Sequence, residues 1–135
     1  MARSAAVARP RFPEKELAAP ALRTFFNIAT LWELSVDEQI TLLGVGARST
    51  YFKWKQSPPA TLPADTLERL SYILGIYKAL QILLPDERAA DAWVRRPNAA
   101  PPFNGQSALQ RMLQGRVADL YEVRRYLDAE RGGWT

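Results

Sequence analysis

The segment WVRRPNAAPPFNGQSALQRMLQG, residues 93–115, decides the fold of this chain. Pro97 disfavours the helical conformation of the residue before it, which ends the preceding helix. Ser107, followed three residues later by Gln110, is a capping box that begins a new short helix. Gly115 stands where a glycine that ends a helix belongs. The segment therefore predicts the end of one helix, a loop and a short capped helix.

The composition excludes several classes of protein. A chain of 135 residues, 47% hydrophobic and 24% charged, is long enough for one domain or two very small helical ones. The chain has no cysteine, which excludes disulfides, thiolate metal sites and cysteine nucleophiles. It also has no histidine, the commonest general base and metal ligand. We therefore expect no catalytic residues, no metal and no cofactor.

The charge and the hydrophobic pattern narrow the possible partners. A net charge of +4 permits nucleic-acid binding without requiring it. No apolar run approaches eighteen residues, so we expect no membrane span and a cytoplasmic protein. Residues 1–20 hold three prolines among arginines and alanines, which predicts a flexible basic arm.

Three short helices are predicted between residues 21 and 58. Apolar residues recur at helical spacing over residues 21–34, which indicates a buried first helix. Ser35 and Glu38 form a capping box that opens a second helix, which ends at Gly44. A third helix covers residues 47–56. Three short helices with a glycine turn between the last two are typical of a helix-turn-helix.

The remainder of the chain, residues 62–135, is also predicted to be helical. Residues 62–84 are apolar around so wide an arc that the helix should pack on two neighbours or on a second copy of itself. A short helix over residues 86–95 and a last helix over residues 116–131 follow. The side of the last helix predicted to be buried carries Val117, Leu120, Tyr121, Val123 and Leu127. No strand signal is present, so the predicted fold class is all-α.

The third helix carries the candidate DNA contacts. A recognition helix needs basic and small polar side chains to reach phosphates and base edges. The candidates are Arg48, Ser49, Thr50, Lys53 and Lys55. Tyr51 and Trp54 are expected in the core, and Phe52 fits either place. The competing interpretation is a structural three-helix module whose lysines are simply solvated.

Two stretches of the chain resemble a family of antitoxins. The order W-V-x-x-P-N, a loop, then N-G-x-S-x-x-x-x-x-L-x-G resembles the toxin-binding domain of the Xre/MbcA/ParS antitoxins. Its matching positions are Trp93, Pro97, Asn98, Gly105, Ser107, Leu109, Leu113 and Gly115. The second stretch resembles the Xre helix-turn-helix pattern, with a turn from Gly44 to Thr50 that is one residue longer. It matches at Leu42, Leu43, Gly44, Val45, Thr50, Lys53 and Trp54.

The resemblance implies an N-terminal helix-turn-helix domain and a C-terminal domain that dimerises and binds a RES-domain toxin acting on NAD. It implies steric inhibition of the toxin and repression of an operator by the homodimer. In the family the inhibitory contacts lie near the C-terminus, which favours Arg131, Gly132, Gly133 and Trp134, with Arg124 and Arg125 as further candidates. The motif positions Trp93, Asn98, Gly105, Leu109 and Gly115 are expected to be structural.

Two alternatives to an antitoxin stay open on the sequence alone. One is a dimeric helix-turn-helix regulator with no toxin partner. The other is a small helical acid–base enzyme, which the absence of histidine and cysteine disfavours.

Overall fold

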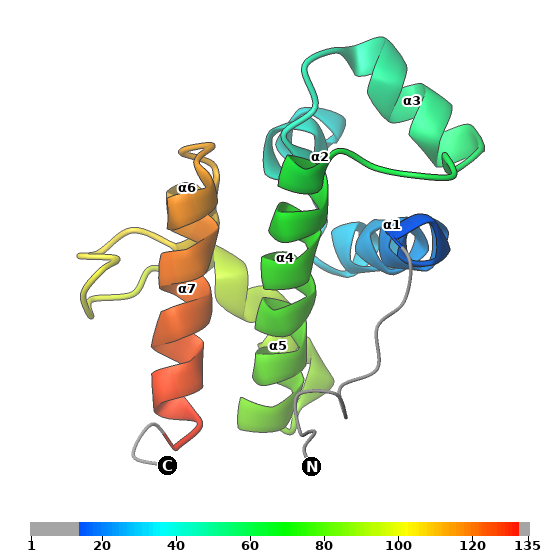
Figure 1. The fold of residues 1–135 in the computed structure, drawn as a ribbon. Coiled ribbons are helices and arrows are strands. Elements are labelled where there is room, and N and C mark those ends of the chain that lie inside the picture. The colour runs from blue at the N-terminus through cyan, green and yellow to red at the C-terminus, as the bar shows by residue number, and fades with distance from the viewer. Residues whose placement is uncertain (1–13, 133–135) are drawn as a thin grey trace, which may run out of the picture.

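A computed structural model describes residues 14–132, with the side chains from residue 17 onward. These residues form an all-helical structure (Figure 1), and they hold no strand beyond a single bridge between Pro97 and Ser107. The elements in chain order are α1 (Glu14–Leu31), α2 (Val36–Leu43), α3 (Arg48–Gln56), α4 (Ala64–Leu83), α5 (Glu87–Ala92), η2 (Trp93–Arg95), α6 (Ala108–Met112) and α7 (Val117–Glu130). The all-α prediction is confirmed. No helix in the described part of the chain is long and apolar enough to cross a bilayer.

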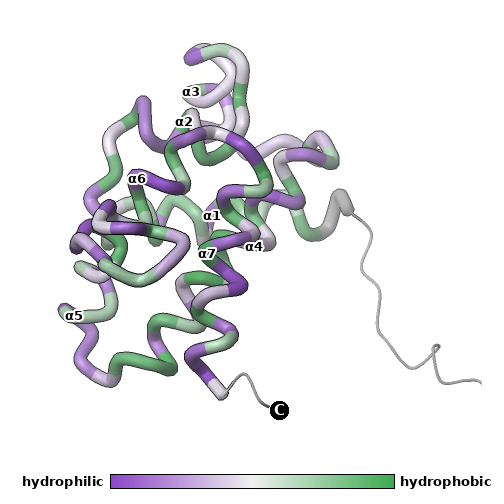
Figure 2. Tube along the Cα trace, turned by 90° about the vertical axis from the view of Figure 1, so that its left-hand side faces the viewer, coloured by the Kyte–Doolittle hydropathy of each residue, from purple (hydrophilic) through white to green (hydrophobic). Residues whose placement is uncertain are grey.

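The long helix α4 lies at the centre of the fold. It packs most extensively on α7 and also contacts α1, α2 and α5 (Figure 1). Its buried apolar side chains share one continuous core with those of α1, α2, α3 and α7. Hydrophobic positions alternate with hydrophilic ones along the helices (Figure 2). The sequence left open whether α4 packs on two neighbouring helices or on a second copy of the chain, and the structure shows packing on neighbours within the chain. Ile82, near the end of α4, is 52% exposed.

The first helix differs from its prediction at both ends. It begins at Glu14, so the predicted arm is wrong for residues 14–20, although α1 contains Pro20. Pro20 lacks the backbone N–H that would otherwise bond to the preceding turn of this helix. The helix ends at Leu31 because Glu33 adopts a left-handed conformation with φ of 56°, a place usually taken by glycine.

The turn between α2 and α3 depends on Gly44. Its φ is 71°, and its N–H donates to Thr41 O at 3.1 Å while the N–H of Val45 donates to Ile40 O at 3.2 Å. This pair of bonds closes a helix around a left-handed residue. The α2 capping box between Ser35 and Glu38 is present as predicted. Local interactions therefore fix both ends of α2, the first helix of the helix-turn-helix.

We expect Gly44→Ala to lower the free energy of unfolding by about 1–2 kcal/mol, because a side chain disfavours this left-handed conformation. The added Cβ would also lie 2.5 Å from Nε of Arg69, which must then move. Urea denaturation followed by circular dichroism measures the change. Gly46→Ala is the matched control, since nothing in the described part of the chain lies within 4 Å of its added Cβ. A loss from Gly46→Ala as large as that from Gly44→Ala would contradict this explanation.

Candidate functional surfaces

The helix α3 is held firmly against the helices beneath it. Tyr51 and Trp54 are buried, as expected from the sequence. The hydroxyl of Tyr51 donates to Oε1 of Gln39 at 2.7 Å, and Nε2 of Gln39 donates to Leu34 O at 3.1 Å. These buried bonds fix the rotation of α3 about its own axis, so the outward face of α3 is well defined.

The outward face of α3 follows from that rotation. An α-helix turns by about 100° per residue, so the side chains opposite Tyr51 and Trp54 are those of Ser49, Phe52, Lys53 and Gln56. All four are exposed. The helix carries three basic residues and no acidic one. Lys53 is the cation on this outer face, beside an aromatic ring and polar side chains, and Arg48 and Lys55 add positive charge around it.

Arg48 lies at the start of this face. It forms an ion pair with Asp37 at the beginning of α2, and its guanidinium lies 5.7 Å from the centre of the Phe52 ring. Both partners of the ion pair are largely exposed, so the pair contributes little to stability. Arg48 can therefore exchange Asp37 for a phosphate or a base edge at small cost.

Two predicted DNA contacts lie at the edges of α3 rather than on its outer face. Thr50 is half-buried. Nζ of Lys55 lies over the ring of Phe26 at 5.1 Å and near Tyr51 at 6.0 Å. Sequence reasoning left Phe52 open between the core and the DNA contacts and did not name Gln56; both share the outer face with Ser49 and Lys53. The signal was available, because the expected burial of Tyr51 and Trp54 already fixes the opposite side of the helix.

Of the predicted toxin contacts, Arg124 and Arg125 lie on different sides of α7. Nε of Arg124 donates to Oδ2 of Asp128 at 3.1 Å, and its guanidinium lies where a Cβ on Gly75 of α4 would be. Arg124 is therefore mainly a contact between α4 and α7. Arg125 is exposed and lines a shallow hollow of about 280 Å³, whose other walls are Pro101, Pro102, Glu122, Tyr126 and Ala129.

The remaining predicted toxin contacts lie at the end of the chain. Arg131 is exposed directly after α7, where its N–H donates to Leu127 O at 3.0 Å. Gly132 follows with φ of 119°. Gly133 and Trp134 lie outside the described residues.

Tyr121, predicted on the buried side of α7, is instead exposed and packs edge-on against Tyr72 of α4.

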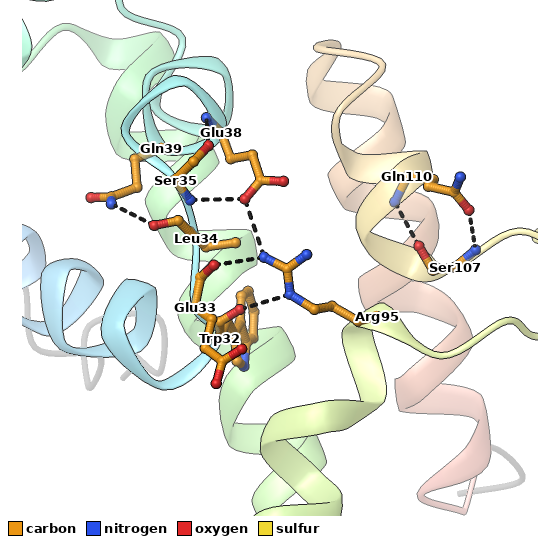
Figure 3. Close-up of polar contacts among 9 residues, drawn as sticks. All are labelled: Trp32, Glu33, Leu34, Ser35, Glu38, Gln39, Arg95, Ser107 and Gln110. Atoms are coloured by element: carbon orange, nitrogen blue, oxygen red, sulfur yellow. Dashed lines mark hydrogen bonds and ion pairs between the residues drawn. The ribbon is translucent and has the colours of Figure 1, made fainter.

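The loop between η2 and α6 is held by its own backbone and by the motif residues. The N–H of Asn98 donates to Gln106 O at 3.0 Å, and that of Gly105 donates to Asn98 O at 2.7 Å. Ser107 and Gln110 form the predicted capping box of α6 (Figure 3). The loop is thus closed on itself, and Pro97 lies opposite Ser107 across its base.

Aromatic packing fastens this loop to the last helix. The ring of Trp93 stacks on Tyr126 of α7 at 6.2 Å, and Phe103 meets both rings edge-on. Leu109 is buried in the core. Gly115 does not end α6 itself, since the helix stops at Met112, but with φ of 93° it turns the chain into α7. The motif positions therefore build the surface beside α7.

Arg95 joins the C-terminal half to the helix-turn-helix (Figure 3). Its Nε donates to Trp32 O at 3.0 Å, and its Nη2 donates to Glu33 O at 2.7 Å and to Oε1 of Glu38 at 3.2 Å. It thereby binds carbonyl groups that the end of α1 leaves without helical partners. Sequence reasoning did not assign Arg95 a role, because its partners lie about sixty residues away in the chain.

A second charged cluster holds the turn between α6 and α7. The carboxylate of Asp119 is buried and accepts hydrogen bonds from Nε of Arg111 at 3.0 Å and Nε of Arg116 at 3.1 Å. Burial alone would raise the pKa of Asp119. The hydrogen bonds from Arg116 and Arg111 outweigh burial, so the pKa of this carboxyl is lowered.

The two candidate surfaces lie apart in the structure. Figure 1 shows α3 at one end of the molecule and the end of α7 at the other. Between these two surfaces, Arg69 of α4 joins α4 to the turn before α7, because its Nη2 donates to Gly115 O at 3.0 Å. Its Nε donates to Oδ2 of Asp65, also on α4, at 2.8 Å. The arrangement leaves both surfaces accessible at once.

Comparison with known proteins also divides the chain into an N-terminal and a C-terminal part. Residues 12–75 match the antitoxin Xre-like helix-turn-helix domain, and residues 79–133 match the antitoxin Xre/MbcA/ParS C-terminal toxin-binding domain. The chain is also 62% identical over 112 residues to the uncharacterized protein y4oB of Sinorhizobium fredii, which covers 83% of this chain and 84% of that protein. The two domain matches meet within α4. The chain belongs to the Xre/MbcA/ParS family of antitoxins.

Proposed function

We propose that this antitoxin neutralises a RES-domain toxin that acts on NAD, and that as a homodimer it represses its own operon in the cytoplasm. The observation that carries the proposal is the match of residues 79–133 to the toxin-binding domain. The mechanism is steric: the antitoxin docks over the entrance to the toxin's NAD site, and no chemistry on the antitoxin is needed.

The toxin-binding surface that we propose centres on the end of α7. Arg131 is exposed there, and Arg125 is exposed one turn and a half earlier, beside the hollow formed with Pro101 and Pro102. Arginine and aromatic residues are the side chains that most often anchor interfaces. The segment from Gly132 to Trp134 continues from this end and would enter the toxin. Arg124 is left out of this surface because it serves the α4–α7 contact.

The DNA-binding surface that we propose is the outer face of α3. Its positive charge suits the phosphate backbone, and its exposed polar side chains suit base edges in the major groove. A homodimer would place two α3 helices on the half-sites of a palindromic operator. The two surfaces lie at opposite ends of the molecule in Figure 1, so one antitoxin could hold the toxin and the operator together.

Co-expression with a candidate RES-domain toxin tests the toxin half of the proposal. We expect the two proteins to co-elute in size-exclusion chromatography as one complex. Deletion of residues 131–135 should weaken the complex and release toxin activity, because it removes Arg131 and the segment that follows α7. The control is Arg124→Ala, which removes a neighbouring arginine that faces α4.

The possible outcomes separate the candidate functions. Full inhibition by the chain without residues 131–135 would keep the antitoxin but place its inhibitory contacts elsewhere on α7. The absence of any complex with the RES protein would overturn the proposed partner and leave a dimeric DNA-binding regulator.

A further inference from the structure

Phe52 presents an aromatic ring to solvent in the middle of a basic helix surface. Its side chain is 47% exposed, and it lies on the outer face of α3 with Ser49, Lys53 and Gln56. A single exposed hydrophobic residue is normal on a protein surface, so the position of this ring among the candidate DNA contacts, and not its exposure alone, is the informative observation. The other large exposed hydrophobic residues, Leu17, Leu31, Ile82 and Tyr121, lie on other helices. Phe52 is the one among them that shares a face with the candidate DNA contacts.

The Phe52 ring is held in place by its neighbours. It meets the buried ring of Tyr51 edge-on, with ring centres 5.0 Å apart and an angle of 80° between the planes. The guanidinium of Arg48, one helical turn earlier, lies 5.7 Å from its centre. The contact with the buried Tyr51 ring restricts the rotation of the side chain before any ligand binds, whereas the exposed Arg48 can move to a ligand. A side chain that is ordered in advance loses less conformational entropy on binding.

The charge around Phe52 identifies the class of partner. The helix carries Arg48, Lys53 and Lys55 and no acid, which complements a polyanion. An apolar protein surface would have to desolvate these cations on docking, whereas duplex DNA pairs them with phosphates. In the major groove the C5-methyl group of thymine is the apolar group that base pairs display, and phenylalanine is one of the residues that contact it.

We propose that Phe52 reads the C5-methyl group of a thymine in each half-site of the operator. The ring would pack on the methyl group while Lys53 and Arg48 bind the flanking phosphates or bases. This readout rests on the proposed DNA-binding function and adds the base that determines specificity at one position. It needs no change in the fold, because the ring already points outward.

The test compares thymine with uracil, which differs from it only by lacking the methyl group. Duplexes that bind the full-length protein are first selected from a random-sequence library. Each thymine of the selected half-site is then replaced singly by deoxyuridine, and affinity is measured by fluorescence anisotropy. At one position we expect about fourfold weaker binding per half-site, the value for one methyl group removed from an apolar contact.

The variant Phe52→Ala should bind the thymine and uracil duplexes equally, and Phe52→Leu should keep part of the discrimination. Gln56→Ala, one turn away on the same face, is the matched control and should still distinguish the two bases. Because Phe52 and Gln56 are both exposed, we expect all three variants to have the circular dichroism spectrum of the wild type.

Failure of the readout is distinguishable from failure of the function. Equal affinity of the wild-type protein for thymine and uracil at every position, with DNA binding intact, would overturn the readout alone. Discrimination that persists in Phe52→Ala would assign it to another side chain and also overturn the proposal. No binding to any selected duplex would overturn the proposed DNA binding, and the readout with it.

Discussion

Reversal of two charges on α3, in the double variant Arg48→Glu/Lys53→Glu, should weaken operator binding by about 100-fold or more. Each cation is expected to form a charge-assisted hydrogen bond to DNA worth about 1.5–3 kcal/mol. Reversal also places two carboxylates against the phosphate backbone in every half-site. Both side chains are exposed, and the ion pair lost with Arg48 is a surface pair, so the fold should be retained.

The measurement is fluorescence anisotropy over a range of salt concentrations. The slope of the logarithm of affinity against the logarithm of salt concentration should become shallower, by about one for each lost phosphate contact. The control is Lys78→Glu/Arg88→Glu, which changes the net charge equally on exposed residues of α4 and α5. The helix α5 and the C-terminal end of α4 lie away from α3 in Figure 1. An equal loss in the control would show that net charge, and not α3, governs binding.

Asp119→Asn should lower the free energy of unfolding by about 2–3 kcal/mol, since it removes the charge from a buried ion pair. Asp119 is 1% exposed, while its partners Arg111 and Arg116 are 27% and 70% exposed. Because the arginines are partly exposed, we expect a smaller loss of free energy of unfolding than for an ion pair in which both partners are buried. The carboxylate also accepts a hydrogen bond from the backbone N–H of Arg116 at 3.2 Å, which fixes the start of α7.

The pH dependence gives an independent test of the same ion pair. Because the folded state lowers the pKa of Asp119, its stabilising effect is fully present above the unfolded-state pKa of about 3.9. It is lost as the pH falls through the lower pKa of the folded state. The difference in stability between wild type and Asp119→Asn should therefore be constant near neutral pH and shrink below about pH 4.

Urea denaturation at several pH values measures this difference. Asp128→Asn is the matched control, because Asp128 pairs with Arg124 on the same helix but has a side chain that is 47% exposed. Its loss should be no more than about 0.5 kcal/mol. An equal loss in the two variants, or a difference for Asp119 that persists unchanged at low pH, would contradict the role assigned to burial.

Local interactions explain which parts of the fold could be predicted from the sequence. The capping boxes at Ser35 and Ser107 join residues three apart, and the turn at Gly44 needs only its own conformation. The helices that these signals begin or end were therefore predicted closely. The motif from Trp93 to Gly115 likewise carries its loop and cap within a short stretch of chain.

The features that the sequence did not predict depend on distant partners. The end of α1 is set by Glu33 in a left-handed conformation, which Arg95 supports from another helix. The role of Arg124 depends on Gly75, a glycine on α4 that leaves room for its guanidinium. Neither pairing has a local sequence signal. The site residues on α3 and α7 that sequence reasoning proposed are still predictions about binding.

The measurement that tests this function most directly is the rate of NAD consumption by the purified RES toxin as the full-length antitoxin is added. We expect the rate to fall in proportion to the antitoxin added and to approach zero once every toxin is bound, because the docked antitoxin closes the NAD site. Bovine serum albumin at equal concentration should leave the rate unchanged. An undiminished rate in the presence of excess folded antitoxin would contradict the proposed inhibition.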